Sequence, residues 1–531
     1  MRSTARIGVL LLIGVTSACR QTSETASAET PTLVVLMVVD QLRPDLLHRY
    51  DTLFVGGLRR LLDDGYRFTD ATHEHAITET APGHATLATG VYPTRHGIVA
   101  NTWSEFEGGE WRSVYSMEDL NRPILGYPEL PGRSSSNLDR RGLPDWITDA
   151  DPDSRVVSIS RKDRAAIGLA AKAVGEVYWL VDGGGGFVTS DFYHSVYPAW
   201  LAEFNATTMP LVYSDSVWES TIPPGASSLT RPDTSRFELD GEHTFFPHRA
   251  SEMGDATDPR ALNHWRYRYT PFPDRVVVAL AGEAIRQLEL GQRESVDYLG
   301  LSLSQTDLVG HFYGPLSREQ LDNLLRLDLE LGRFFSLLDE AVGPGRWVLA
   351  FSADHGVLDI PEHLVERGVD AARMTAGDRE ELRKRVQVAR DGAGTDDAPE
   401  DAVKAALMTL PFVAAAYTFT DIEAEAQVDS FEVLFARSFS RTRAAGPAAT
   451  AGVHVRLGPN VLFGLSGLPT SHGSPYYYDR HVPMIFLGAM IRPGVSNERV
   501  ATVDVAPTLA WLIGTTAPDD LDGRVLEGVL R

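Results

Sequence analysis

The chain has 531 residues, of which 43% are hydrophobic, and a formal net charge of −23 at pH 7. That much apolar sequence can fill a large core, which excludes disorder of the whole chain. The negative charge argues against sequence-independent binding to nucleic acid, which depends on Lys and Arg neutralising phosphates. An anionic substrate therefore needs local positive charge, such as metal ions, inside the protein.

The first residues have the pattern of an export signal. Arg2 and Arg6 precede an apolar run over residues 7–15, which is too short to span a bilayer and is typical of a signal peptide. Cys19, the only cysteine, follows small residues as in a bacterial lipoprotein box, with Thr16 where that box usually has Leu. We expect an exported, periplasmic protein whose membrane contact is a lipid on Cys19. Ordinary cleavage without lipid remains the alternative.

The rest of the chain alternates strand-like and helix-like segments. Residues 1–18 are the expected lipoprotein-type signal, residues 19–30 a flexible tether, and residues 31–531 the folded domain. Continuous apolar runs of strand length are typical of strands buried on both faces of a parallel sheet. We therefore predict an α/β fold with a largely parallel central sheet flanked by helices. Its strands are expected at Leu33–Val39, Val156–Ile159, Tyr298–Leu303, Trp347–Phe351 and Met484–Leu487.

The clearest helical pattern covers residues 317–338. Ser317 and Gln320 predict a capping box, and apolar side chains recur along one stripe. Three acidic residues are interpreted as the solvated face of this helix: Asp322, Asp328 and Glu330.

Two segments are expected to be cap insertions over the sheet. The first covers about residues 165–270 and is rich in Gly, Pro and aromatic residues. The second covers about residues 361–460.

Polar side chains follow four of the predicted strands. In α/β sheets the ligand site lies beyond the carboxyl ends of the strands, so we expect these side chains at one edge. They are Asp40, Lys162 with Arg164, Asp307, and Asp354 with His355.

Two of these positions have the spacing of metal ligands. Asp307 and His311, four residues apart, lie on one face of a helical turn. Asp354 and His355 point to opposite faces of a regular strand, so both serve one ion only if the chain turns sharply, which Gly356 permits. Zinc takes imidazole nitrogen and carboxylate oxygen, and two such ions can hold the attacking and leaving oxygens of an in-line displacement. Each pair taken alone is more often structural.

A helix-like stretch follows Thr78 and Thr80. A Thr at this place is usually only an N-cap. The start of a helix also offers N–H groups to an anion, and a Thr hydroxyl becomes a nucleophile when a base or a metal activates it.

As an ordered set, several segments resemble the alkaline phosphatase superfamily. They are Val39-Asp40, Thr78–His84, Thr94–Ile98, Thr306–His311, Ala353–Gly356 and His472-Gly473. The set is closest to the branch of type I phosphodiesterases and nucleotide pyrophosphatases that use a Thr nucleophile. Within that branch, residues 97–101 and 160–164 resemble the PafA-type, phosphate-irrepressible bacterial alkaline phosphatases, which act on phosphate monoesters. The resemblance covers nearly the whole chain from about residue 31 and implies an alkaline-phosphatase-like sandwich.

The resemblance also implies two zinc ions and a nucleophile. One ion would be held by Asp307, His311 and His472. The other would be held by Asp40, Asp354 and His355. Thr80 would bind this second ion as the nucleophile, and its spacing to Gly83 and His84 favours it over Thr78.

Three further residues are implied in binding the substrate phosphate and in separating monoester from diester chemistry: Asn101, Lys162 and Arg164. A monoester spreads its charge over three oxygens, which an ammonium and a planar guanidinium stabilise. The alternative for Lys162 and Arg164 is a salt-bridged surface loop around Asp163.

The implied function is a zinc-dependent alkaline phosphatase that hydrolyses small phosphate monoesters through a phosphothreonine intermediate. No nucleic-acid partner is expected, and a monomer is favoured while the oligomeric state stays open. The alternatives are a phosphodiesterase or nucleotide pyrophosphatase with the same metal site, and a metal-binding lipoprotein without turnover. A sulfatase is disfavoured because its Cys/Ser-x-Pro-x-Arg signal does not surround Thr80.

Overall fold

A computed structural model describes residues 30–392, 399–424, 429–464 and 467–530. The predicted signal peptide, Cys19 and all but the last residue of the predicted tether lie outside these ranges. Within them, every helix is too short or too polar to cross a bilayer.

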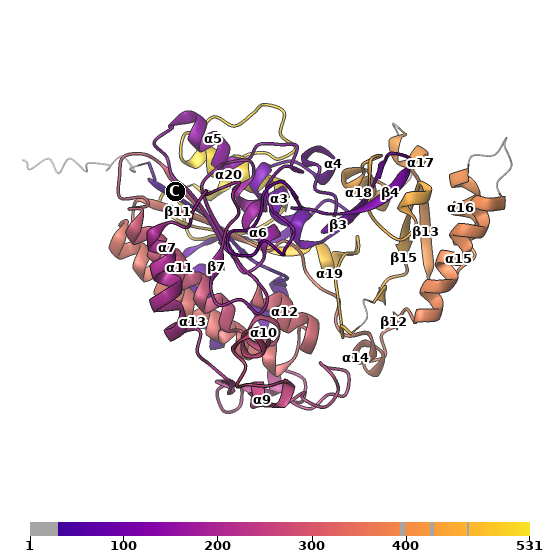
Figure 1. The fold of residues 1–531 in the computed structure, drawn as a ribbon, viewed down its shortest axis with the longest axis horizontal. Helices are drawn as coiled ribbons and strands as arrows, with labels where there is room; N and C mark the ends of the chain where they lie inside the picture. Colours follow the sequence, from indigo (N-terminus) through magenta and orange to yellow (C-terminus); the bar gives the residue numbers. More distant parts are fainter. Residues whose placement is uncertain (1–29, 393–398, 425–428, 465–466, 531) are drawn as a thin grey trace, which may run out of the picture.

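The centre of the molecule is a nine-stranded sheet in the order β18-β2-β17-β11-β1-β10-β5-β6-β7 (Figure 1). The five predicted strands all belong to it: β1 (Leu33–Val39), β5 (Val156–Ser160), β10 (Asp297–Leu303), β11 (Trp347–Ser352) and β17 (His481–Gly488). The other four are β2 (Tyr66–Thr72), β6 (Glu176–Leu180), β7 (Phe187–Val188) and β18 (Gly494–Ala501). The run β11-β1-β10-β5-β6 is parallel, and β17 is antiparallel to both of its neighbours. The predicted fold class is confirmed.

Both faces of the central strand β1 are buried. Val35 and Met37 pack into one core with helices α2 (Gly57–Asp64), α11 (Phe272–Gln287) and α13 (Arg318–Ala341). Leu36 and Val38 pack into the opposite core with α5 (Leu143–Ala150) and α20 (Val505–Leu512). This double burial explains why the strand reads as an uninterrupted apolar run.

Helix α13 begins where the sequence predicts. The Ser317 hydroxyl accepts a hydrogen bond from the Gln320 backbone N–H at 3.0 Å. The Gln320 amide donates to the Thr306 carbonyl at 2.8 Å, so it serves the neighbouring helix and does not return to the cap.

The predicted solvated face of α13 is wrong for two of its three acids. Asp322 and Asp328 are 0% and 1% exposed. Asp322 accepts hydrogen bonds from the Trp218 indole and from Thr221. Asp328 accepts from four backbone N–H groups at the start of α2, those of Val55, Gly56, Leu58 and Arg59, at 2.7–3.2 Å. Each carboxylate is buried because it satisfies donors from a segment far away in sequence.

The two expected insertions differ in how they relate to the sheet. Strands β6 and β7 lie inside the first expected insertion, so the excursion from the sheet begins only after Val188. The second insertion has a core of its own, at the right of Figure 1. This core lies between α15 (Ala376–Gly392), α16 (Pro399–Leu407) and the paired strands β13 (Val413–Thr418) and β15 (Val453–Leu457).

Replacing Asp328 by alanine should lower the free energy of unfolding by about 2–4 kcal/mol, because buried N–H groups at the start of α2 lose their acceptor. Glu330→Ala on the same helix is the control: it removes an ion pair with the exposed Arg333 and should cost less than about 0.5 kcal/mol. Urea unfolding of the two variants measures the difference. An equal loss in both would contradict the capping role.

Candidate active site

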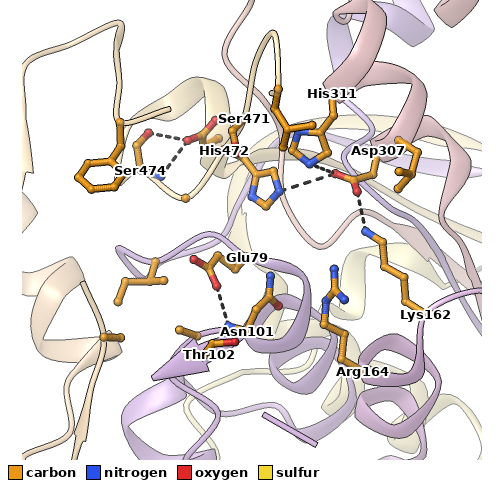
Figure 2. Close-up of a pocket in the computed structure, with 18 of the residues that line it drawn as sticks. Glu79, Asn101, Thr102, Lys162, Arg164, Asp307, His311, Ser471, His472 and Ser474 are labelled. Atoms are coloured by element: carbon orange, nitrogen blue, oxygen red, sulfur yellow. Dashed lines mark hydrogen bonds and ion pairs between the residues drawn. The ribbon is translucent and has the colours of Figure 1, made fainter. Parts of the chain in front are cut away.

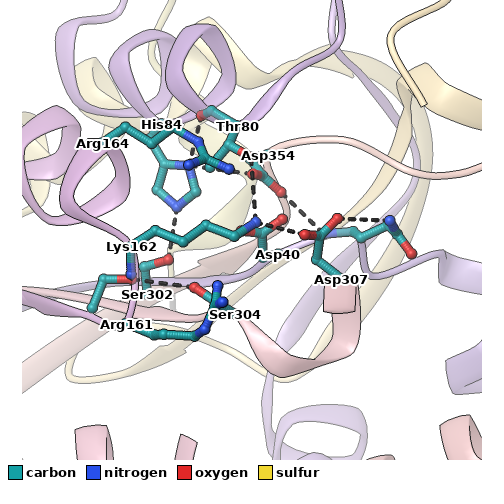
Figure 3. Close-up of polar contacts among 12 residues, drawn as sticks. Asp40, Thr80, His84, Arg161, Lys162, Arg164, Ser302, Ser304, Asp307 and Asp354 are labelled. Carbon is teal, nitrogen blue, oxygen red and sulfur yellow. Dashed lines mark hydrogen bonds and ion pairs between the residues drawn. The ribbon is translucent and has the colours of Figure 1, made fainter. Parts of the chain in front are cut away.

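The carboxyl ends of the parallel strands bring the predicted polar side chains together. Asp40 follows β1, Lys162 follows β5, and Asp307 lies in the first turn of α12 (Gln305–Tyr313), directly after β10. The Lys162 ammonium lies 2.6 Å from an oxygen of Asp40 and 2.6 Å from an oxygen of Asp307 (Figure 3). Asp354 follows β11 and reaches the same cluster through the backbone N–H of Gln41, which donates to its Oδ1 at 3.0 Å.

This cluster carries more negative than positive charge. Asp40, Asp307 and Asp354 are at most 2% exposed. Burial, aided by the other two carboxylates, raises the pKa of Asp40 well above its usual range. Burial opposes ionisation of Asp307 as well, yet its electrostatic interactions with His311 and Lys162 hold its pKa well below the usual range. One ammonium among three buried carboxylates leaves room for further cations.

Three imidazoles are oriented toward the carboxylates in the same way. Because a carbonyl oxygen can only accept, each Nδ1 that meets one carries the hydrogen and leaves Nε2 as a free ligand atom. The contacts are His311 to Thr470 at 2.9 Å, His355 to Gly356 at 3.0 Å and His472 to Thr78 at 2.7 Å.

The donor atoms form two overlapping groups. In each group three ligand atoms lie within 4.8 Å of one another: Asp307, His311 and His472 in one, and Asp40, Asp307 and His355 in the other. The first equals the set implied by the resemblance, whereas the second contains Asp307 where Asp354 was expected. Asp354 Oδ2 nevertheless lies 3.4 Å from His355 Nε2. Three buried atoms without a hydrogen bond face this region: Asp40 Oδ1, Asp354 Oδ2 and His355 Nε2. Carboxylate oxygen and imidazole nitrogen in these groups fit zinc.

Two glycines allow close packing around Asp354. A Cβ on Gly83 would lie 2.2 Å from the Asp354 carbonyl oxygen, and one on Gly356 would lie 2.2 Å from that of Tyr478. Gly356 does not have a positive φ. It is needed for the close approach of another segment.

Thr80 is the first residue of α3 (Thr80–Thr89), and its hydroxyl lies 3.4 Å from the Lys162 ammonium. The Thr78 hydroxyl instead donates to the Ser474 carbonyl at 2.9 Å. Of the two candidate threonines, Thr80 is therefore the one that faces the carboxylates. It is not the N-cap, which is Glu79.

Asn101 and Glu79 hold the start of α3. Asn101 Oδ1 accepts the backbone N–H of Ala81 at 2.8 Å, and the Asn101 N–H donates to Glu79 Oε2 at 2.6 Å. Since its oxygen is engaged, the Asn101 side chain is left with its NH₂ group for a ligand.

Sequence reasoning missed Glu79 and also Gln41, whose side-chain amide donates to Asp307 Oδ1 at 2.7 Å. Glu79 precedes the candidate nucleophile Thr80, and Gln41 follows the candidate ligand Asp40. These adjacencies are the only signals that the sequence gives for either residue.

Lys162 and Arg164 do not form a salt-bridged loop with Asp163. The Asp163 carboxylate accepts from the Tyr115 hydroxyl and from Arg133 Nε. Arg164 is half-buried, and its Nε has no hydrogen-bond partner among the described residues. Lys162 contacts the carboxylates of Asp40 and Asp307 and also borders a cavity.

Seven of these groups border one cavity of about 1010 Å³: Glu79, Asn101, Lys162, Arg164, Asp307, His311 and His472. Figure 2 shows Asn101 and Arg164 on one side of it, with Asp307, His311 and His472 facing them. Phe435 and His454 of the second insertion also line it. The cavity brings candidate metal ligands and cationic side chains together, and Lys162 connects it to the Thr80 hydroxyl.

Comparison with known proteins shows the family and the fold of the chain. The sequence profile described as type I phosphodiesterase / nucleotide pyrophosphatase matches residues 34–415. The chain is 30% identical to alkaline phosphatase PhoK of a Sphingomonas species, over 94% of this chain and 92% of that protein. It is 29% identical to PhoV of Synechococcus elongatus (94% and 93%) and 28% identical to PafA of Elizabethkingia meningoseptica (99% and 98%).

The crystal structure of wild-type PafA matches the fold with a TM-score of 0.86 at 27% identity, covering 95% of this chain and 99% of that one. The chain therefore belongs to the type I phosphodiesterase / nucleotide pyrophosphatase family and has the alkaline-phosphatase-like fold of PafA.

Proposed function

We propose that the protein is a zinc-dependent alkaline phosphatase that hydrolyses small phosphate monoesters through a phosphothreonine on Thr80. The observation that supports this most is the contact of the Thr80 hydroxyl with Lys162 inside the carboxylate cluster. PhoK, PhoV and PafA are all named alkaline phosphatases.

Two zinc ions would be held by the oriented imidazoles and the buried carboxylates. Asp307, His311 and His472 form one ligand set, and Asp40, Asp354 and His355 form the other, with the Thr80 oxygen beside the second. When bound, such a pair of ions stabilises the charge on the attacking and leaving oxygens.

The nucleophilic step falls to Thr80. Its place at the first residue of α3 fixes the hydroxyl against the Lys162 ammonium, which favours the alkoxide over the alcohol. The Thr80 oxygen attacks phosphorus, the bond from phosphorus to the alcohol oxygen breaks, and the alcohol leaves with a proton. Water then displaces the threonine oxygen, and phosphate is released. Two in-line displacements give net retention at phosphorus.

Selectivity for monoesters would come from three donors. The Asn101 NH₂ group, the Lys162 ammonium and the Arg164 guanidinium border the same cavity and together favour a phosphoryl group with three charged oxygens. Glu79 supports this arrangement by holding the Asn101 backbone.

We also propose that the protein works outside the cytoplasm. The export pattern of residues 1–18 and the position of Cys19 support periplasmic export with a lipid anchor.

Thr80→Ala should lower kcat on phenyl phosphate by at least about 10³-fold, because the attacking oxygen is removed. Thr80→Ser keeps the oxygen and should stay within about tenfold of the parent. Thr78→Ala, a matched change two residues away, should stay close to wild type. Phosphate release measures all three, and mass spectrometry after acid quenching should detect phosphate on Thr80 of the parent. A fast Thr80→Ala protein would rule out this nucleophile.

Arg164→Ala should lower kcat/KM for phenyl phosphate by about 10²-fold and for bis-phenyl phosphate by less than about tenfold, because only the monoester has the third charged oxygen. Arg164→Lys keeps the charge but not the planar fork and should recover part of the loss. The ratio of the two rates in each variant is the measurement. Equal losses on both esters, or a parent that prefers the diester, would favour a phosphodiesterase.

Chelation should abolish activity and lower the melting temperature, because the buried carboxylates lose their counter-charge; added zinc should restore both. Elemental analysis should find about two zinc ions per chain in the parent and about one in His472→Ala. His481→Ala is the control, because His481 contacts the Thr69 carbonyl and not the cluster. Full zinc content in His472→Ala would contradict the ligand assignment.

A further inference from the structure

Arg161 is a buried cation that the proposed chemistry does not use. It stands between strand β5 and Lys162, is 5% exposed, and lines the same cavity. Figure 3 shows its guanidinium beside Ser304, away from the carboxylates that Lys162 contacts.

The charge of Arg161 has no matching carboxylate. Its Nε donates to the Tyr267 carbonyl at 3.1 Å, and its guanidinium carbon lies 3.7 Å from the centre of the Tyr267 ring. Within the described ranges, no Asp or Glu forms an ion pair with it, and its terminal nitrogens make no hydrogen bond. Burial raises the pKa of Asp274 to about 7, and Asp274 already accepts from the N–H groups of Ser304 and Gln305, so it is a weak counter-charge.

A buried, permanently charged guanidinium without a partner is costly unless an anion binds to it. Arg268 lines the same cavity, but unlike Arg161 it is more exposed and lies 3.7 Å from an oxygen of Asp182. Among the described residues, Arg161 is thus a buried cation beside Tyr267 that has no ion pair and is free to bind an anion.

The surroundings of Arg161 place that anion on the alcohol part of an ester. Leu308 and Phe312, on the helix that carries Asp307 and His311, line the cavity together with Arg161 and Tyr267. In the proposed function, Asp307 and His311 belong to the ligand set on the side of the leaving oxygen, and Thr80 belongs with the other set. In an in-line displacement the alcohol leaves on the side opposite to the nucleophile. This wall therefore faces the departing alcohol and combines apolar side chains with one free guanidinium.

We propose that Arg161 binds a second anionic group, a carboxylate or a phosphate, on the leaving alcohol, so that the preferred substrates are small phosphate monoesters with an acidic alcohol part. The proposal rests on the proposed phosphatase function and adds a substrate class to it.

The test compares 4-carboxyphenyl phosphate with 4-carbamoylphenyl phosphate, which has nearly the same shape but no second charge. Arg161→Met should lower kcat/KM about tenfold or more for the carboxylate ester and less than about twofold for the amide, because a charge-assisted hydrogen bond is lost. The intrinsic reactivity of each ester cancels, since each is compared between parent and variant. Arg161→Lys should recover part of the loss, and Arg268→Met should change the two esters equally. Hydroquinone bisphosphate in place of the carboxylate ester tests phosphate as the second anion. If Arg161→Met lowers kcat/KM for only the carboxylate ester or only the bisphosphate, that result identifies the anion that Arg161 binds.

Binding of the free alcohol tests the anion site at Arg161 independently of phosphatase activity. Calorimetric titration of the parent should show tighter binding of 4-hydroxybenzoate than of 4-hydroxybenzamide, and Arg161→Met should abolish the difference. Such binding in a protein that hydrolyses neither ester would sink the phosphatase function and leave the anion site standing. Equal losses of Arg161→Met on charged and neutral esters, or no preference of the parent for the benzoate, would overturn the role of Arg161.

Discussion

The structure depends on the burial of three carboxylates, Asp40, Asp307 and Asp354, at the carboxyl edge of a parallel sheet. Each carboxylate belongs to a different strand or to the helix that follows it, and the strands that carry them lie next to one another. A single ammonium, that of Lys162, cannot balance this charge in a low-dielectric interior. The proposed zinc ions would therefore stabilise the folded chain as well as support its chemistry. Their binding and the stability of the fold would be coupled, because the carboxylates that hold the ions otherwise repel each other inside the core.

The other residues of the site form hydrogen bonds that fix the positions of these carboxylates and of the groups around them. Gln41 uses its backbone N–H for Asp354 and its side-chain amide for Asp307, so one residue ties two of the carboxylates together. On the other side, Glu79 and Asn101 hold the first turn of α3, where Thr80 lies. Backbone carbonyls fix the orientation of the imidazoles of His311, His355 and His472. Each group near the candidate metal positions is thus fixed by a second contact, which is the condition for a site that does not rearrange during reaction.

The sequence predicts well those parts whose environment is local. Strands β1, β5, β10, β11 and β17 are recognisable because burial on both faces makes them continuously apolar. Strands β2 and β18 lie together at one edge and mix polar with apolar residues, so no single pattern marks them. Asp322 and Asp328 resemble a solvated helix face because the donors that they satisfy come from Trp218 and from the start of α2. Such partners are a property of the fold and not of the neighbouring residues. Gln41 and Glu79 were missed for the same reason.

The chain has a net charge of −23, yet the cavity concentrates Arg161, Lys162 and Arg164 within one short segment after β5. The long-range field repels an anion, so selection must occur at contact distance, where low dielectric strengthens each interaction. Lys162 contacts the carboxylates, Arg164 lies on the same side of the cavity as Asn101, and Arg161 is turned toward Tyr267. Three of the four residues that follow β5 thus serve different parts of one cavity. Under the proposed function, this edge of the sheet would both hold the phosphoryl group and select the alcohol that fits beside it.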